Sequence, residues 1–283
     1  MTMDKIKLEP AAALNMLWGK RAFEGEILDK FISHLDLSSG NELYEKCNSI
    51  CEWYDEVILN RKYFIENYIS EKLAASDEEH LIIILAAGKS PLSLSLLNQH
   101  LKKINKILEI DLVGMDEKKE LYDRQFPKYS EKIKCITADI SSKPILMMLN
   151  SCLHEYYNNI PCIVILEGIA CFLSPDDIKN IIASFKSSKK NNQLLVEYLL
   201  PTENVSEEIR KIPQSIYSTI QESIGLKNIS FYTNEIMTKI VTANGGKLVE
   251  VKNLRGIEKQ RLGENKYFSG SSDSWIECSV WEL

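Results

Sequence analysis

The stretch that most constrains the fold spans residues 80–94, where an apolar run leads through small residues into a helix start. Residues 81–85 are branched and apolar without a helical period, which is typical of a strand buried on both faces. Ala86-Ala87-Gly88 permits a close backbone turn. Ser90 and Pro91 suit the N-cap and first position of a helix. The stretch predicts a βα unit, serving either as plain structure or as a ligand site at the helix N-terminus.

A second apolar strand at residues 107–112 ends in acidic residues and favours the ligand site. Asp111 follows Gly88 by 23 residues. A carboxylate about 20 residues beyond a glycine turn lies at the tip of the neighbouring strand, where it accepts hydrogen bonds from ribose hydroxyls. Glu109 and Asp111 share a strand face, so we expect one of them to face a ribose. The other interpretation is an Asp that caps the next helix.

Charge and hydropathy exclude several classes of protein. The net charge is −6 and the pI is about 5.5, with basic residues spread among acidic ones, which argues against nucleic-acid binding. No apolar run is long enough to span a bilayer, and the N-terminus has no signal-peptide pattern. We therefore expect a cytoplasmic protein that binds neither nucleic acid nor membrane. The seven cysteines form no CxxC pair, so we expect reduced, buried thiols without a metal or a disulfide framework.

The chain divides into a helical N-terminal part and a part in which strands alternate with helices. Apolar residues recur at helical spacing through residues 1–75, which we expect to form a cap on the core. Residues 76–283 are expected to form an α/β domain, a doubly wound, mostly parallel, seven-stranded Rossmann-like sheet with an antiparallel edge strand. Residues 201–229 are polar and helix-capable, as in a helical insertion that closes over a site.

Predicted boundaries follow from the same patterns. Beyond the first strand, strands are expected at residues 106–112, 132–137, 162–166, 193–200 and 247–251, and an antiparallel edge strand at 274–281. Helices are expected at residues 90–101, 116–122, 144–153, 175–185 and 231–243.

Five segments, in this order, resemble the leucine carboxyl methyltransferase family. They are NRKYF (60–64), ILAAGKS (84–90), ILEIDL (107–112), TADI (137–140) and LEGIACFLSPDDI (166–178). The resemblance spans roughly residues 20–200. It implies a class I O-methyltransferase that uses S-adenosylmethionine, releases S-adenosylhomocysteine and needs no metal.

The resemblance also implies which residues hold that cofactor. Arg61 matches the basic residue that reaches the methionine carboxylate from the cap, with Lys20 as a second. Glu167 matches the acid near the methionine ammonium, and charge-assisted bonds of this kind are strong. Asp111 matches the ribose-binding acid. The whole expected set is Lys20, Arg61, Ala86, Gly88, Asp111, Leu112, Asp139, Ile140, Glu167 and Gly168, in which Asp139 and Ile140 bracket the adenine.

Three positions depart from the family pattern. The family usually has Gly-Ala-Gly where this chain has Ala86-Ala87-Gly88, so the first alanine is expected to crowd the turn. It usually has Asp-Thr in place of Ser90-Pro91. Phe172 stands where a tyrosine is common, which removes a hydroxyl near the acceptor pocket.

The resemblance implies methyl transfer by in-line displacement, in which the protein supplies alignment and a dry site. A carboxylate acceptor, on a small molecule or a protein C-terminus, is ionised at neutral pH and needs no general base. The sequence offers few bases, which favours that acceptor, and no catalytic residue is assigned. A hydroxyl acceptor of natural-product type and a non-catalytic cofactor-binding partner subunit remain as alternatives. Aromatic residues expected to line the acceptor pocket, or else to pack in the core, are Trp18, Phe23, Tyr63, Phe172 and Tyr217.

Overall fold

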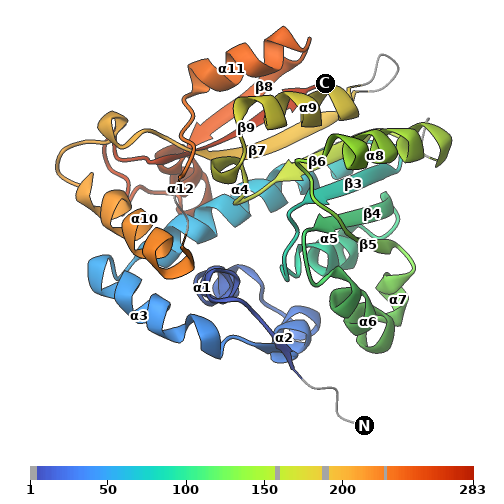
Figure 1. Cartoon of the computed structure of the whole chain (residues 1–283), viewed down its shortest axis with the longest axis horizontal. Coiled ribbons are helices and arrows are strands. Elements are labelled where there is room, and N and C mark those ends of the chain that lie inside the picture. The colour runs from blue at the N-terminus through green and yellow to red at the C-terminus, as the bar shows by residue number, and fades with distance from the viewer. Residues whose placement is uncertain (1–4, 157–159, 187–190, 226–227) are drawn as a thin grey trace.

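A seven-stranded sheet forms the centre of the computed structural model, with the strand order β5-β4-β3-β6-β7-β9-β8 (Figure 1). The strands are β3 (His80–Leu85), β4 (Ile104–Asp111), β5 (Ile133–Thr137), β6 (Cys162–Leu166), β7 (Gln193–Leu199), β8 (Lys247–Asn253) and β9 (Ile276–Glu282). From β5 to β7 every neighbouring pair is parallel, whereas β9 is antiparallel to both β7 and β8. The structure describes residues 5–156, 160–186, 191–225 and 228–283, with the side chains of residues 150 and 152–156 left aside.

The predicted Rossmann-like sheet, mostly parallel with antiparallel pairing at one edge, is confirmed. The last strand lies one position inside that edge, because β8 is the outermost strand. Burial explains this order. Cys278, Val280 and Trp281 of β9 are buried, whereas β8 exposes Lys247 and Val249 and is only partly buried at its other positions. Both faces of a central strand are covered by helices, so such a strand carries apolar residues on both faces, whereas an outermost strand remains partly open to solvent.

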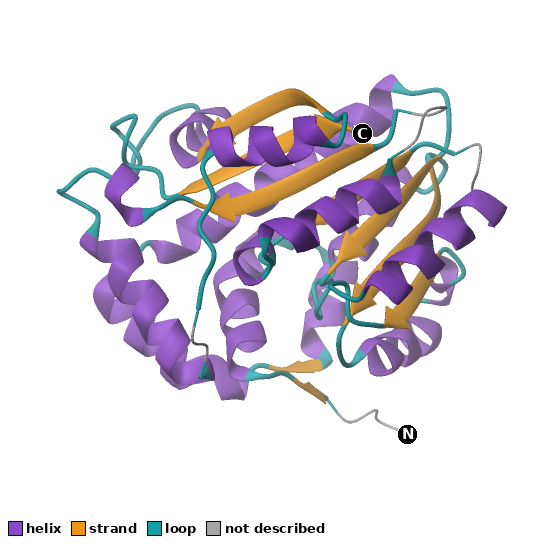
Figure 2. Ribbon diagram, turned by 45° about the horizontal axis from the view of Figure 1, so that its top comes forward, coloured by secondary structure: helices purple, strands orange, loops and turns teal. Residues whose placement is uncertain are grey.

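Helices cover both faces of the sheet (Figure 2). Ile82 and Ile84 of β3 belong to one hydrophobic cluster, and Leu81, Ile83 and Leu85 belong to another, as the alternation of a strand requires. Helices on the first side are α4 (Tyr54–Ala75), α5 (Leu92–His100), α6 (Met115–Gln125), α7 (Pro127–Ser130) and α12 (Leu254–Leu262). Helices on the second side are α8 (Lys143–Tyr156), α9 (Pro175–Phe185) and α11 (Asn234–Ala243).

The N-terminal residues pack against the first side of the sheet. Trp18 and Phe31 belong to the same hydrophobic cluster as Ile82. The elements here are β1 (Ile6–Lys7), α1 (Pro10–Gly19), η1 (Lys20–Ala22), α2 (Glu26–Ser33), β2 (Leu35–Asp36), η2 (Ser38–Gly40) and α3 (Asn41–Ile50). The parallel β1–β2 pair was not predicted. Figure 1 shows α1 and α3 packed together with α10 (Lys211–Ile224). Helix α10 belongs to the expected insertion at residues 201–229, of which residues 226–227 lie outside the described chain. Two short turns, η3 (Ala170–Phe172) and η4 (Thr202–Asn204), complete the elements.

Two predicted helix starts, those of α5 and α11, were wrong by two and three residues. Helix α5 begins at Leu92 with Pro91 as its N-cap, not Ser90, because the Pro91 carbonyl accepts the first helical bonds, from Leu94 and Ser95. The Ser90 hydroxyl still accepts from the Leu92 N–H at 3.4 Å. Helix α11 begins at Asn234, after the capping residue Thr233. Helices α7 and α12 were not predicted.

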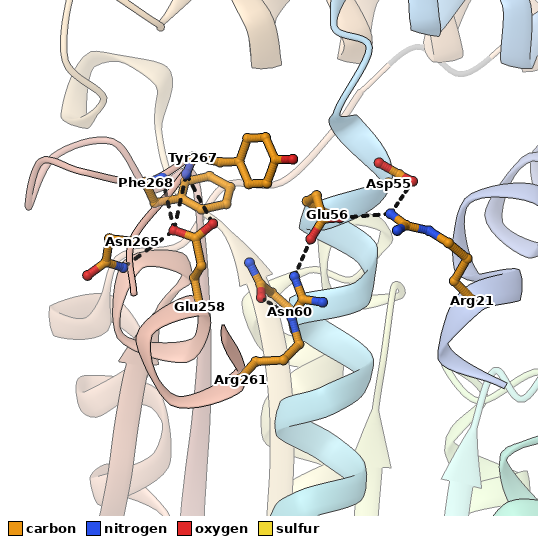
Figure 3. Close-up of polar contacts among 9 residues, drawn as sticks. All are labelled: Arg21, Asp55, Glu56, Asn60, Glu258, Arg261, Asn265, Tyr267 and Phe268. Carbon is orange, nitrogen blue, oxygen red and sulfur yellow. Dashed lines mark hydrogen bonds and ion pairs between the residues drawn. The ribbon is translucent and has the colours of Figure 1, made fainter. Parts of the chain in front are cut away.

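Glu56 ties helix α4 to the elements on either side of it (Figure 3). Its Oε1 lies 2.7 Å from Arg21 Nη2 of η1, and its Oε2 pairs with Arg261 of α12. Arg261 also donates from Nε to Asn60 Oδ1 at 2.8 Å. Glu258 of α12 accepts hydrogen bonds from the backbone N–H groups of Tyr267 and Phe268, which fixes the loop that follows this helix. The bonds of Glu56 and Asn60 hold the N-terminal part of α4 in one position.

Within the described residues, no helix has the length and apolar character that a membrane crossing requires. The six cysteines with described side chains are free thiols, and Cys152 lies outside this set. Burial raises the pKa of Cys162 and of Cys171 to about 12, so both thiols are protonated at neutral pH.

The turn after β3 uses left-handed backbone at two positions. Gly88 has φ 51°, and Ala86 has φ 58°, the one positive value at a non-glycine residue in the described chain. A Cβ in this region clashes with its own backbone, at a cost of roughly 1–2 kcal/mol. The turn is held nonetheless, because Ala87 N–H donates to the Ile110 carbonyl and Gly88 N–H to Asp111 Oδ2.

We predict that Ala86→Gly raises the free energy of unfolding by about 1 kcal/mol, since glycine adopts this φ without strain but loses more chain entropy. Urea titration followed by circular dichroism measures the change. Ala87→Gly is the matched control, because Ala87 has no positive φ; it should lower stability. An unchanged or lower midpoint for Ala86→Gly would contradict the strain.

Candidate cofactor site

A cleft lies at the carboxyl ends of β3, β4 and β6, where helices α1 and α4 meet the sheet. Its lining combines small residues of the turn after β3 with charged residues of α4 and of the strand ends. The lining residues are Ala12, Asn15, Met16, Arg61, Lys62, Ile84, Ala86, Ala87, Gly88, Lys89, Ser90, Leu92, Glu109, Glu167 and Gly168. At one rim, Lys89 donates to the carbonyl of Gly114. This is where ligands bind in open α/β sheets.

Asp111, at the end of β4, is not among the residues that line the cleft, but it contacts Gly88, which is. Its Oδ2 accepts from Gly88 N–H at 2.7 Å, and its Oδ1 accepts from Leu112 N–H at 2.7 Å. Each carboxylate oxygen has two lone pairs, so both can accept a further bond. These contacts place the carboxylate directly beside the glycine turn, as the spacing in the sequence predicted.

Glu109 is used inside the protein. It is fully buried, and its Oε1 accepts from Ser93 Oγ at 2.5 Å and from Tyr122 Oη at 3.1 Å. Its Oε2 lies 3.0 Å from Lys118 Nζ, which is also fully buried. A buried carboxylate needs such partners. Of the two acids that the sequence left open, Asp111 is therefore the better candidate for the ribose.

Arg61 enters the cleft from α4 and is held by a residue that the sequence analysis missed. Its Nε lies 2.5 Å from Glu197 Oε2 of β7, and both side chains are buried. The register that pairs Leu166 with Val196 brings Glu197 level with Glu167. A Cβ on Gly168 would lie 3.3 Å from Arg61 Nη2, so glycine leaves room for the guanidinium there. Glu197 binds Nε, and the terminal nitrogen Nη2 lies beside Gly168, which lines the cleft.

Lys62 is the second cation of the cleft, and it pairs with Glu167. Lys62 Nζ lies 2.8 Å from Glu167 Oε1, with both side chains largely buried. Burial would raise the pKa of Glu167, but the charges of Lys62 and Arg61 outweigh it and lower that pKa below its ordinary value. Glu167 is therefore ionised at neutral pH. Lys62 directly follows Arg61 in the sequence, which was the one available signal for it.

Three residues of the expected cofactor set, Leu112, Asp139 and Ile140, do not line the cleft. Leu112 is 63% exposed and the adjacent Val113 is 65% exposed. Asp139 is exposed, and its Oδ1 accepts from the Ser141 backbone and hydroxyl, which lower its pKa. Ile140 is buried.

Other expected site residues lie elsewhere. Lys20 is exposed on η1 and does not line the cleft. Phe172 is 46% exposed on η3. Tyr63 is half-buried against the first hydrophobic cluster, and Trp18 and Tyr217 are buried in that cluster. Among the described side chains, no group of three or more His, Cys, Asp or Glu is arranged to hold a metal ion.

The sheet order and the cleft at its carboxyl ends define a Rossmann-like methyltransferase fold. A crystal structure of a methyltransferase candidate from Thermobifida fusca superposes with a TM-score of 0.61 at 11% identity, covering 97% of this chain and 95% of that one. A DUF574 family protein from Streptomyces avermitilis gives a TM-score of 0.60 at 10% identity, with 97% of each chain covered. At such identities the likeness concerns the fold.

The family model for leucine carboxyl methyltransferases matches residues 20–186, more than half of the chain. The chain belongs to that family and is an S-adenosylmethionine-dependent methyltransferase. The resemblance seen in the sequence motifs is thus confirmed. No curated protein matches the sequence.

The buried ion pair between Arg61 and Glu197 leads to a prediction about the stability of the protein. Glu197→Gln should lower the free energy of unfolding by about 3 kcal/mol, because it removes the carboxylate in direct contact with a buried guanidinium. Urea titration of the free protein measures the loss. The double variant Arg61→Met, Glu197→Leu should recover more than half of it, since two apolar residues leave no buried charge.

Glu207→Gln is the matched control, because Glu207 is exposed; it should change stability by less than about 0.5 kcal/mol. A single Glu197→Gln variant as stable as this control would show that the pair contributes nothing.

Proposed function

We propose that the chain transfers the methyl group of S-adenosylmethionine to a carboxylate, forming a methyl ester. The observation that supports this most is the set of charges at the strand ends. Arg61 and Lys62 offer two cations, Glu167 offers an anion beside them, and Asp111 lies at the glycine turn. The cofactor presents one carboxylate, one ammonium and two ribose hydroxyls, so the residues present fit it group by group.

In this proposal each charged residue has one task. Arg61, fixed through Nε by Glu197, binds the methionine carboxylate with its terminal nitrogens, and bidentate geometry suits that contact. Glu167 accepts the ammonium, in the place that Lys62 Nζ takes in the free protein. Lys62 is then released toward the same carboxylate. The N-terminal helices thereby act as a cap that supplies both cations to the core.

The cofactor supplies an electrophilic methyl group on a sulfonium. A carboxylate oxygen attacks that carbon, the C–O bond forms as the C–S bond breaks, and the electron pair stays on sulfur. No proton moves, so no general base is required. The two carboxylates that line the cleft agree with this, because Glu167 and Glu109 are both held in ion pairs. The protein's part is to align the groups and exclude water.

Asp111→Asn should weaken binding of S-adenosylhomocysteine at least tenfold, because charge-assisted bonds to the ribose become neutral ones. The amide can keep its place beside the turn through its remaining oxygen. Titration calorimetry measures the affinity. Asp116→Asn, on the exposed start of α6, is the control and should bind normally. Full affinity in Asp111→Asn would refute the ribose assignment.

A further prediction concerns the chemical nature of the methylated product. With radiolabelled S-adenosylmethionine, and small carboxylic acids or a peptide with a free C-terminal leucine as acceptors, the labelled product should release methanol in mild base. A methyl ester is hydrolysed under these conditions, whereas an ether is stable. A base-stable product would identify a hydroxyl acceptor instead. Tight cofactor binding without transfer to any acceptor would point to the non-catalytic alternative.

A further inference from the structure

Lys89 lines the cofactor cleft, but the function proposed above assigns it no task. Its side chain is 11% exposed, although lysine side chains are mostly exposed because the ammonium is strongly hydrated. Burial accordingly lowers its pKa below the ordinary value. Glu117 lies 3.4 Å from Lys89 Nζ, but the Glu117 side chain is 65% exposed, so water screens this ion pair. The buried position of Lys89 therefore calls for another explanation.

The ammonium of Lys89 joins two turns at the carboxyl ends of the strands. Lys89 directly follows Gly88 in the turn after β3, and its Nζ donates to the carbonyl of Gly114, at the far end of the turn after β4. The same carbonyl accepts the first helical bond of α6, from Lys118 N–H at 3.2 Å. Lys89 thus connects the glycine turn to the start of α6.

Gly114 suits this contact in two ways. Its φ of 72° lies in the left-handed region, which glycine adopts without strain. A Cβ at this position would lie 2.6 Å from Lys89 Nζ and 3.1 Å from Lys89 Cε. A side chain here would therefore push the ammonium out of its place.

The bond from Lys89 bears on the carboxylate of Asp111. Oδ2 of this carboxylate accepts from Gly88 N–H, and Oδ1 accepts from Leu112 N–H. Leu112 and Val113 are 63% and 65% exposed, so apolar packing does little to fix the chain that carries the second donor. Lys89 holds the far end of that chain at Gly114. Two adjacent residues, Gly88 and Lys89, thereby hold both ends of residues 111–114.

We propose that Lys89 is a positioning residue for the cofactor, which acts by holding the turn after β4 so that the Asp111 carboxylate is directed at the ribose. The inference rests on the proposed function. A carboxylate held in its binding orientation before the ligand arrives loses less freedom on binding, so the same two ribose bonds give a higher affinity.

Lys89→Met tests the proposal in the full chain, because methionine keeps the apolar stem and lacks the donor. The probes are S-adenosylhomocysteine and 5′-methylthioadenosine, which has the ribose but no amino-acid part. Calorimetry should show that the variant binds both probes about tenfold more weakly, by the same factor. Gly114→Ala displaces the ammonium from the other side of the contact and should weaken both probes in the same way.

A double-mutant cycle separates positioning from a general loss of structure. In the Asp111→Ala background no carboxylate is left to position, so adding Lys89→Met should change the affinity for S-adenosylhomocysteine less than about twofold. Lys106→Met is the matched control, because Lys106 Nζ also donates to a backbone carbonyl, that of Glu131, but from the opposite end of β4. It should bind both probes as the parent does.

Three results would overturn the proposal. They are parental affinity in Lys89→Met, a loss confined to S-adenosylhomocysteine, and a loss of equal size with and without the Asp111 carboxylate. Failure of the parent to bind S-adenosylhomocysteine would instead refute the proposed function.

Discussion

The site depends on buried charge at the point where helix α4 crosses the strand ends. Arg61 pairs with Glu197, and Lys62 pairs with Glu167, from two adjacent positions of one helix to two adjacent strands. Removing four charges from water is costly, and the attraction between partners repays that cost only where the geometry is good. Apolar residues of similar size would serve stability as well. The presence of the four charged residues is therefore explained more readily by a ligand that carries both an ammonium and a carboxylate.

Helix α4 can present these charges accurately because it is fixed along its length. The Glu56 network shown in Figure 3 joins it to η1 on one side and α12 on the other. Apolar packing adds to this, since one hydrophobic cluster includes residues of the N-terminal helices and of the sheet. Long, flexible cations lose less freedom on binding when their backbone and stems are already held.

The sequence predicted those parts of the molecule that are set by local pattern. The turn at residues 86–88 and the distance to Asp111 follow from neighbouring residues, and the structure joins Gly88 to Asp111 as expected. Helix α9 was predicted to the residue, because its Ser174 capping box and Pro175 are local signals. The resemblance to the family predicted further charged binding residues, Arg61 and Glu167 among them.

What the sequence could not predict depends on contacts between distant segments. Glu197 reads as one polar residue in a buried strand until the fold brings it to Arg61, 136 positions away. Lys20 and Lys62 look alike in sequence, and only the direction of η1 and α4 distinguishes the exposed side chain from the buried one. The place of β9 between β7 and β8 likewise depends on pairing between strands that are not consecutive in the chain. At Ala86 the structure accepts backbone strain that glycine would avoid.

A crystal structure of the protein with S-adenosylhomocysteine tests the central claim most directly. The account predicts the ribose hydroxyls on the Asp111 carboxylate, the ammonium on Glu167 in place of Lys62, and the carboxylate on the terminal nitrogens of Arg61. A nucleoside bound away from the carboxyl ends of β3, β4 and β6, or a Lys62–Glu167 pair left intact with the ligand present, would contradict it.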